Sequence, residues 1–281
     1  MQTSTTHIET LQKTYERFPF GVIRIIGKDS VDFLQRITTN DFENFDSGDI
    51  QKTLIITEKG RIVDAVWVIH RGSDLLMLCS YSISDDVIVW LNKFIIMEDI
   101  VLENVTSKFR IDVSFGAGVI QESSYVTDFF GKEIRLSISE VMDASVQLPD
   151  RAFELWRIEQ GIPVSKKELI QDYNPLELNL WDWISFTKGC YIGQEVIARL
   201  DTYQKIQRAL CLISFSDKID EGDIIVDNEK TPIGKITSII DAIGLAVIRS
   251  KYAHQFTSLH TVNNSEFRIE KVFKKEEHGR N

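Results

Sequence analysis

The sequence predicts an α+β protein that ends in a small antiparallel β-barrel or sandwich. Between residues 22 and 94 the chain reads as strand, helix, two or three strands and helix, which is typical of an α+β layer rather than of repeating parallel units. Beyond residue 207 the character changes to short β-rich runs separated by glycines and Asp/Asn turns. These observations divide the chain into an α+β region over residues 1–200 and a barrel over residues 201–281.

The α+β region begins with a strand and a helix. Residues 22–26 form a β-rich run, and Asp29 or Ser30 can cap a helix over residues 31–37, where apolar residues recur three apart. The side chains of the polar run Thr38–Phe42 compete with the backbone for hydrogen bonds. This run therefore predicts a loop or a capping turn.

Two further β-rich runs, residues 51–57 and 61–70, read as a hairpin joined by a turn that contains glycine. Asp64 lies within the second run, and a carboxylate in an apolar strand is costly unless it is paired or hydrogen-bonded. Alternation along the strand would place Asp64 opposite Val63 and Ala65, on the solvent face. The residues by themselves favour this solvent-facing interpretation.

Residues 116–148 mix glycine, serine and short β runs and give no clear placement. Pro149 and Asp150 then open a helix over residues 151–160, and Gly161 fits the left-handed position that ends a helix. The other elements expected before residue 116 are a strand at 74–80, an amphipathic helix at 84–94 and two strands within 98–115. The strands expected in the barrel are 208–215, 223–226, 233–240, 244–249 and 266–272.

The segment Lys188–Arg199 carries the clearest chemical signal, since Cys190 lies in it between Gly189 and Gly193. Either glycine can take backbone angles closed to other residues and can allow a close approach. Residues 194–200 read as a short helix. Its positive N-terminal end would favour a thiolate at Cys190, and Lys188 would add to this effect. A tight turn with a merely small, buried cysteine is an equally open alternative.

Composition limits the kinds of partner and the compartment that we expect for this protein. A net charge of −10 does not favour nonspecific binding to nucleic acid or to an anionic membrane, and no apolar run is long enough to span a bilayer. The odd count of three cysteines argues for a reducing compartment, so the cytoplasm is expected. Cys79 and Cys211 lie in apolar runs and are expected to be inert core thiols. Three thiols cannot form a four-thiolate metal site, and no metal is expected.

The residues Lys188–Glu195 resemble the signature of the YgfZ-type folate-binding proteins. These are relatives of the aminomethyltransferase, or T-protein, of the glycine cleavage system. The resemblance covers most of residues 22–199 in order and spacing. Further blocks that resemble this family are Phe33–Asp41, Lys59–Asp64, Arg157–Pro163 and Asn174–Glu177.

The resemblance implies a ring of two interleaved α+β domains around a central folate-binding cavity, with the barrel added at the C-terminal end. It implies that Asp64 meets tetrahydrofolate near its reactive nitrogens and that Glu159 binds the pterin ring. A carboxylate can accept paired N–H donors from the pterin, so this assignment is chemically reasonable, and it replaces the solvent-facing interpretation of Asp64. Asn40 and Arg199 match positions near the cavity wall, with capping and surface pairing as their alternatives.

Two departures from the aminomethyltransferases place the chain with the YgfZ branch: Ala65 stands where they commonly carry a second acid, and they lack a thiol matching Cys190. The resemblance then implies a role in iron–sulfur cluster assembly or repair, with client proteins or assembly machinery as partners. Cys190 would be a transient cluster ligand, redox group or acceptor, and Lys188 would tune its charge. Whether this amounts to catalysis is left open. A folate-dependent aminomethyltransferase and a non-catalytic scaffold are the alternatives.

Overall fold

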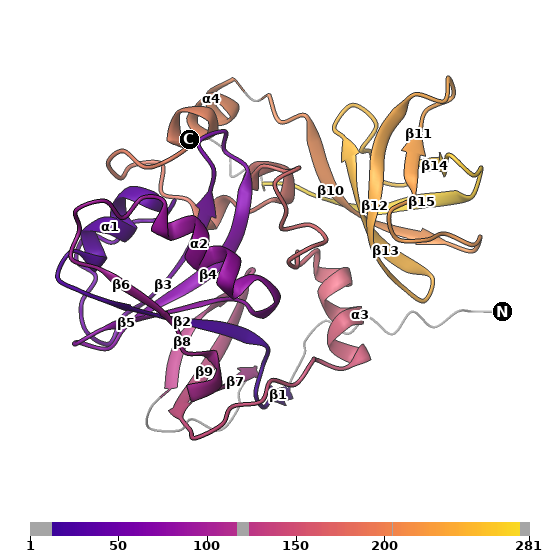
Figure 1. Ribbon diagram of the computed structural model, residues 1–281. Coiled ribbons are helices and arrows are strands. Elements are labelled where there is room, and N and C mark those ends of the chain that lie inside the picture. The colour runs from indigo at the N-terminus through magenta and orange to yellow at the C-terminus, as the bar shows by residue number, and fades with distance from the viewer. Residues whose placement is uncertain (1–12, 117–123, 204, 276–281) are drawn as a thin grey trace.

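The computed structural model describes residues 13–116, 124–203 and 205–275. It contains two antiparallel sheets with few helices and a closed six-stranded barrel, which confirms the α+β class with a C-terminal barrel (Figure 1). The barrel stands on one side of the molecule and the first sheet on the other, with the helix of residues 151–160 between them. No helix in these ranges is long and apolar enough to cross a membrane.

The first sheet has five strands in the order β3-β4-β5-β2-β6, and every pair in it is antiparallel. Its strands are β2 (Phe20–Ile26), β3 (Ile50–Ile56), β4 (Ile62–His70), β5 (Leu75–Ser80) and β6 (Val101–Asn104). Two helices, α1 (Ser30–Ile37) and α2 (Ser84–Asn92), contribute apolar side chains to a core on one face of this sheet. Two short 3-10 turns follow its strands: η1 (Tyr81–Ile83) joins β5 to α2, and η2 (Thr106–Lys108) leads from β6 into the second sheet.

The second sheet has four strands in the order β1-β7-β9-β8. They are β1 (Lys13–Tyr15), β7 (Phe109–Phe115), β8 (Ser124–Phe129) and β9 (Lys132–Glu140). The hairpin of β8 and β9 lies within the stretch that the sequence left unassigned. Its strands alternate weakly, because most residues of β8 are only half-buried. A weak period-2 signal explains why the sequence did not reveal them.

The two sheets are interleaved along the chain, as the resemblance implies. Strand β1 pairs with β7, although all five strands of the first sheet lie between them in sequence. After helix α3 (Arg151–Gln160), the chain returns to the first sheet through η3 (Pro175–Leu178), η4 (Trp181–Trp183) and α4 (Gln194–Thr202). Asp150 caps α3 and Gly161 ends it in the left-handed conformation, which confirms both boundaries predicted from the sequence.

The barrel closes in the order β10-β13-β12-β11-β14-β15. Its strands are β10 (Arg208–Phe215), β11 (Ile224–Val226), β12 (Pro232–Ile240), β13 (Ile243–Arg249), β14 (Ser258–Thr261) and β15 (Glu266–Phe273). The sequence predicted five of these strands and missed β14, a four-residue strand in which only Thr261 is buried. Because the six strands form a closed sheet, the domain is a barrel and not a sandwich, the two alternatives that the sequence left open.

Aromatic rings fill the space between the two sheets and α3. The Trp67 ring stacks on Phe129, with centroids 5.3 Å apart, and it meets Trp183 edge-on at 4.9 Å. On the α3 side, Phe115 contacts Trp156 at 5.0 Å. This core also includes apolar residues from the barrel. We call this cluster of rings, together with the apolar residues around it, the central core.

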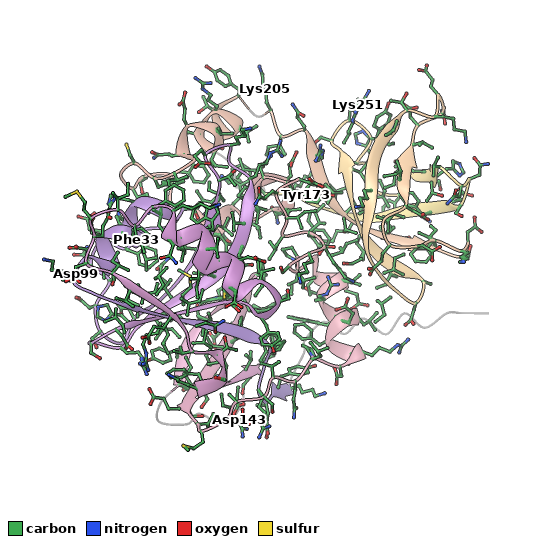
Figure 2. The ribbon with its side chains drawn as sticks, viewed as in Figure 1. Phe33, Asp99, Asp143, Tyr173, Lys205 and Lys251 are labelled. Carbon is green, nitrogen blue, oxygen red and sulfur yellow. The ribbon has the colours of Figure 1, made fainter. Side chains whose placement is uncertain are left out.

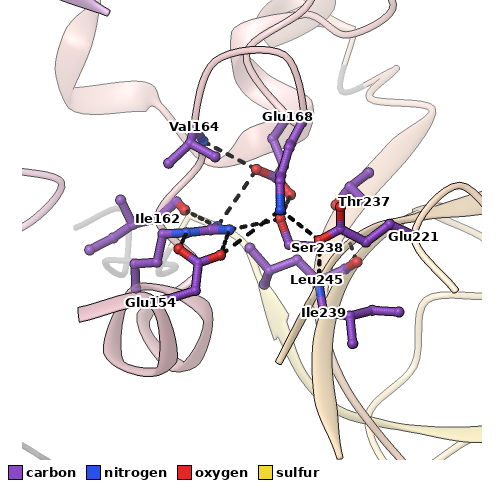
Figure 3. A network of polar contacts seen from close by, with 11 residues as sticks. Glu154, Ile162, Val164, Glu168, Glu221, Thr237, Ser238, Ile239 and Leu245 are labelled. Carbon is purple, nitrogen blue, oxygen red and sulfur yellow. Dashed lines mark hydrogen bonds and ion pairs between the residues drawn. The ribbon is translucent and has the colours of Figure 1, made fainter. Parts of the chain in front are cut away.

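A buried polar network joins α3 to the barrel (Figure 3). The guanidinium of Arg157 is 1% exposed; it pairs with Glu154, donates to the hydroxyl of Ser238 on β12 at 3.0 Å and lies 3.8 Å from Glu168. Glu168 is 0% exposed and accepts from Ser238 at 2.7 Å. Each buried charge thus has an opposite charge and hydrogen-bond partners, which is the condition for tolerating it in the interior.

Replacing Arg157 by leucine leaves Glu168 without its buried counter-charge. We expect the free energy of unfolding, measured with urea, to fall by about 3–5 kcal/mol. Arg151→Leu on the same helix is the control, because its pair with Asp241 is largely exposed and is worth at most about 1 kcal/mol. Equal effects of the two substitutions would show that the network does not stabilise the docking of the barrel.

Candidate functional site

The segment between η4 and α4 presents Cys190 to solvent. A Cβ atom added at the neighbouring Gly189 would meet no atom within 4 Å, so the backbone there is open to an approaching molecule. Gly193 adopts the left-handed conformation with φ of 80°, where a Cβ atom would lie 2.5 Å from the carbonyl oxygen of Thr57. Only Gly193 thus needs both the special backbone angles and the close approach expected for the two glycines.

Lys188 anchors this segment to the loop after α1. Its side chain is buried, and its ammonium donates to the carbonyl oxygen of Thr38 at 3.0 Å and to that of Asn40. The structure therefore brings together Lys188 and Asn40, two predicted site residues that lie far apart in sequence. The hydrogen bonds of the ammonium in the described chain go to these carbonyls, and its remaining contact is the Tyr191 ring at 5.4 Å.

The same two segments are also joined by hydrogen bonds around Thr39. Its hydroxyl donates to the carbonyl of Trp183 at 2.7 Å, and its own carbonyl accepts from the backbone of Ser185 at 3.0 Å. Asn40 donates from its amide to the carbonyl of Lys52 on β3 at 2.9 Å. The loop is a capping turn, as its sequence predicts, because the hydroxyl of Thr38 bonds the last turn of α1. The same loop also holds the segment that carries Cys190, through its hydrogen bonds to Trp183, Ser185 and Lys188.

Burial lowers the pKa of Lys188 to about 8, although the nearby carboxylate of Asp41 acts in the opposite direction. The ammonium is thus held at a cost in desolvation, which the two carbonyls offset by charge-assisted hydrogen bonds. These contacts indicate a positioning role for Lys188. They hold the backbone next to Cys190 in one place.

Asp64 is 0% exposed, so the solvent-facing interpretation of this residue is wrong. Its two carboxylate oxygens accept hydrogen bonds from the backbone N–H and the hydroxyl of Ser80, both at 2.7 Å. Burial raises the pKa of Asp64 to about 6, and the hydrogen bonds from Ser80 limit the rise. The simple alternation failed because the opposite face of this sheet is covered by α1 and α2 rather than by water.

Asp64 and Ala65 lie on opposite faces of β4. Asp64 pairs across the strands with Ile55, which belongs to the core under α1 and α2, whereas Ala65 pairs with Leu54, which belongs to the central core. Residues directly opposite each other share one face of a sheet. Ala65 therefore faces the central core, whereas the carboxylate of Asp64 lies on the face covered by α1 and α2.

The other two predicted ligand residues differ in environment. Glu159 is half-buried on α3, the helix that packs against the central core, which is compatible with binding a pterin there. Arg199 is 71% exposed on α4 and pairs with Glu195 at 2.6 Å, one helical turn away. Its position matches the surface-pairing alternative that the sequence left open. Among the six predicted residues, two are thus joined by a hydrogen bond, and the remaining four lie on separate elements.

Cys79 and Cys211 are both buried, and burial raises the pKa of each thiol, that of Cys211 to about 12. This agrees with the expectation that they are inert core thiols, since the thiolate is the reactive form. Cys190 is the exposed one of the three. Within the described ranges, no group of three or more His, Cys, Asp or Glu residues is arranged to hold a metal ion.

Two concave sites lie away from the predicted residues. One, of about 310 Å³, is lined by Tyr173 and residues of the barrel; the other, of about 570 Å³, is lined by the start of β3 and by β8. No sequence pattern pointed to Ser80 as the partner of Asp64, nor to Thr39 as a link to Trp183. Both links depend on strand pairing between distant segments, for which a single sequence holds no local signal.

Together these features define a class: an α+β protein of interleaved antiparallel sheets with an appended barrel and one exposed thiol anchored by a buried lysine. Comparison with known proteins identifies the family. The family model described as the GCVT N-terminal domain matches residues 8–112, and that of the CAF17 C-terminal beta-barrel domain matches residues 207–271. The chain thus carries regions that match both models, and it is similar to the YgfZ-type proteins and to the aminomethyltransferases.

Curated relatives come from both branches. A putative chloroplastic transferase of Arabidopsis thaliana is 29% identical over 78% of this chain, which spans only 60% of that relative's length. A tRNA-modifying protein YgfZ of Colwellia psychrerythraea is 26% identical over 78% of each chain. An aminomethyltransferase of Caldanaerobacter subterraneus is 25% identical over 83% of this chain and 76% of its own length.

A solved structure shows the same fold. The glycine cleavage system aminomethyltransferase T from Bartonella henselae superposes with a TM-score of 0.74 over 94% of this chain and 87% of its own. The identity in this superposition is 13%, so the match establishes the architecture and not the chemistry.

Replacing Lys188 by methionine keeps the hydrocarbon stem but leaves two buried carbonyl oxygens without their donor. We expect the free energy of unfolding to fall by about 1–3 kcal/mol. Lys59→Met, at an exposed position of the β3–β4 turn, is the matched control and should change stability by less than about 0.5 kcal/mol. An unchanged Lys188→Met protein would show that the ammonium does not anchor the cysteine segment.

Asp64 makes stability depend on pH with a definite sign. Its pKa is about 6 in the folded protein and 3.8 in the unfolded chain, so the folded state holds the extra proton between these values. Stability from this group is present below pH 3.8 and is lost as the pH rises to about 6. Asp64→Asn cannot ionise, so relative to wild type it should gain about 3 kcal/mol between pH 4 and pH 7.

The measurement is the free energy of unfolding of both proteins across that pH range. The asparagine oxygen can still accept from the backbone of Ser80, so the variant is expected to fold. A constant difference between the two proteins from pH 4 to pH 7 would contradict the assignment of this pH dependence to Asp64.

Proposed function

We propose that this chain is a tetrahydrofolate-binding protein that supports the assembly or repair of iron–sulfur clusters in other proteins, using Cys190. The observation that carries the proposal is the state of its thiols. Two are sealed in cores, and the third is exposed next to an open glycine on a segment that Lys188 anchors. A protein with one exposed thiol in a defined position is suited to supply a transient thiolate ligand to a cluster.

One thiolate cannot hold an iron–sulfur cluster by itself, because such clusters are held by several ligands. The remaining ligands would come from a client protein, the assembly machinery, a second copy or a small thiol. Exposure of Cys190 and the open space at Gly189 support access by such a partner. Cys190 would then act as a transient ligand, a redox group or an acceptor, with Lys188 positioning it.

For the folate, Glu159 is the carboxylate that the geometry supports. It lies on α3 beside the central core, and a carboxylate there can accept paired N–H groups of a pterin ring. Asp64 is assigned a structural role through Ser80 instead. We place the protein in the cytoplasm.

A folate-dependent aminomethyltransferase is the second candidate, because an aminomethyltransferase of Caldanaerobacter subterraneus is 25% identical over 83% of this chain. Against it stands Ala65, which faces the centre where the aminomethyltransferases commonly carry their second acid. Turnover of tetrahydrofolate with aminomethyl or methyl donors would establish this function. Tight folate binding without such turnover would exclude it for those donors.

Cys190→Ser should abolish support of iron–sulfur enzymes while leaving the fold intact, because the side chain is exposed. The measurement is the activity of iron–sulfur enzymes under oxidative stress in cells that carry the variant as their sole copy. The name of the YgfZ relative makes the modified-nucleoside content of tRNA a second readout. Glu195→Gln, at an exposed position on the adjacent helix, is the control. Wild-type activity of Cys190→Ser would refute the role of the thiol.

Measurements of folate binding distinguish the roles of the Glu159 and Asp64 carboxylates. By calorimetry, Glu159→Gln should weaken tetrahydrofolate binding by about tenfold or more, because it removes a charge-assisted acceptor. Asp64→Asn should bind as wild type does, since its carboxylate faces the other side of the sheet. The reverse pattern would return Asp64 to the folate site. If wild type binds no folate, the scaffold interpretation replaces the proposal.

A further inference from the structure

The 310 Å³ site lies where the outer face of the barrel meets the loop before η3. Three basic side chains line it: Arg208 from β10, Lys235 from β12 and Arg249 from the end of β13. Tyr173 forms part of its wall. Asp172 contributes the acidic residue of the lining, so the local balance is positive in a protein whose net charge is −10.

Two of these cations face each other across a pair of strands. Arg208 and Arg249 are directly opposite in the antiparallel pairing of β10 with β13. Like charges in this relation are destabilising, because their side chains leave the same face of the sheet a few ångströms apart. Lys235 pairs with Val247, two residues before Arg249 on β13, and so adds a third positive charge to the same outer face.

No ion pair neutralises these three charges within the described chain, although most other arginines there have an acidic partner. Glu177 and Arg208 interact electrostatically, but beyond ion-pair distance. Arg208 is held instead by neutral groups. It donates to the carbonyl of Asp172 at 3.0 Å and lies over the Tyr173 ring at 5.6 Å.

The carbonyl of Asp172 also fixes a fourth cation at the edge of the site. Arg61, the residue just before β4, donates to it at 2.9 Å. Two guanidinium groups, one from the α+β region and one from the barrel, thus converge on one oxygen, and Arg61 also forms an ion pair with Glu177 at 3.8 Å. Such an arrangement is held in place before any ligand arrives, which lowers the entropy cost of binding.

We infer that this pocket binds a compact ligand that carries two or more negative charges on carboxylate or phosphate oxygens. The planar forks of Arg208 and Arg249 match such oxygens in pairs, and the bound anion removes the repulsion between them. Two sources carry this chemistry: the γ-glutamyl tail of a folate, and a free phosphate compound.

The position relative to α3 allows either source. Ser238, which bonds Arg157 on α3, stands three residues after Lys235 on β12, a distance of about 10 Å along a strand. A ligand held at α3 by one end could therefore extend a flexible anionic tail into the pocket, and a separate anion could enter from solvent.

The test is calorimetry on the full chain at about 50 mM salt, where screening is weak. The probes are free tri-γ-glutamate, inorganic pyrophosphate, and tetrahydrofolate with one or three glutamates. We expect wild type to bind at least one free anion, and Arg249→Gln to weaken that binding about tenfold or more. Lys218→Gln, an 88% exposed barrel position with the same change in charge, should have no effect.

Stability provides an independent readout. Because Arg249→Gln removes a like-charge neighbour of Arg208, its melting temperature should equal or exceed that of wild type, whereas a residue with only a structural role would lower it. Arg249→Glu, which can pair with Arg208, should raise the melting temperature and abolish anion binding.

The probes separate the sources. Binding of tri-γ-glutamate, with tighter binding of the triglutamate folate than of the monoglutamate, assigns the folate tail. Binding of pyrophosphate alone assigns a phosphate compound. Binding of neither free anion to wild type, or binding that Arg249→Gln leaves unchanged, overturns the inference. Both free probes report on this pocket even if no folate binds, so failure of the folate proposal is distinguishable.

Discussion

The buried ammonium of Lys188 holds together the surface that we assign to function. It bonds the carbonyls of Thr38 and Asn40, and so fixes a segment near the C-terminal end of the α+β region to the loop after its first helix. A lysine in such a place costs desolvation energy, and the same burial lowers its pKa. The neighbouring Cys190 can be exposed and still have a defined position, because the residue two places before it is anchored in the interior.

The faces of strand β4 set a second constraint. A residue on a buried strand serves either the helix-covered core or the central core, and a shift of one position exchanges the two. Ala65 faces the centre, while Asp64 is sealed against Ser80 on the other side. The small side chain of Ala65 thus faces the central core in a chain that keeps the fold of the aminomethyltransferase T structure over 94% of its length.

Charged residues occur at two places where the barrel meets the rest of the molecule, paired at one and unpaired at the other. At the end of β12 near α3, Arg157 and Glu168 are buried and balanced, and they join the barrel to the rest of the molecule (Figure 3). Around Tyr173, which Figure 2 labels between the central core and the barrel, Arg208 and Arg249 stand opposite each other, and no acidic side chain in the described part of the chain forms an ion pair with either. Balanced charges stabilise an interface, whereas unbalanced ones in a concave site are suited to an external anion.

The sequence by itself determined the local elements with strong periodicity or clear caps. Helix α3 begins at its Asp150 cap and ends at Gly161, as expected, and five barrel strands lie where β-rich runs are separated by turns. The motif around Cys190 identified the superfamily. The short strand β14 and the half-buried hairpin of β8 and β9 were not evident, because their side chains alternate weakly between water and core.

Only the tertiary structure decided which chain segments meet and which face of each strand is covered. It joined Lys188 to Asn40, turned Asp64 from an expected solvent-facing residue into a buried acceptor, and paired Arg208 with Arg249. The physical reason is that hydrogen-bond register and burial depend on contacts between residues far apart in sequence. Local periodicity gives the spacing of side chains along a strand, but the packing of sheets and helices decides what each side chain meets.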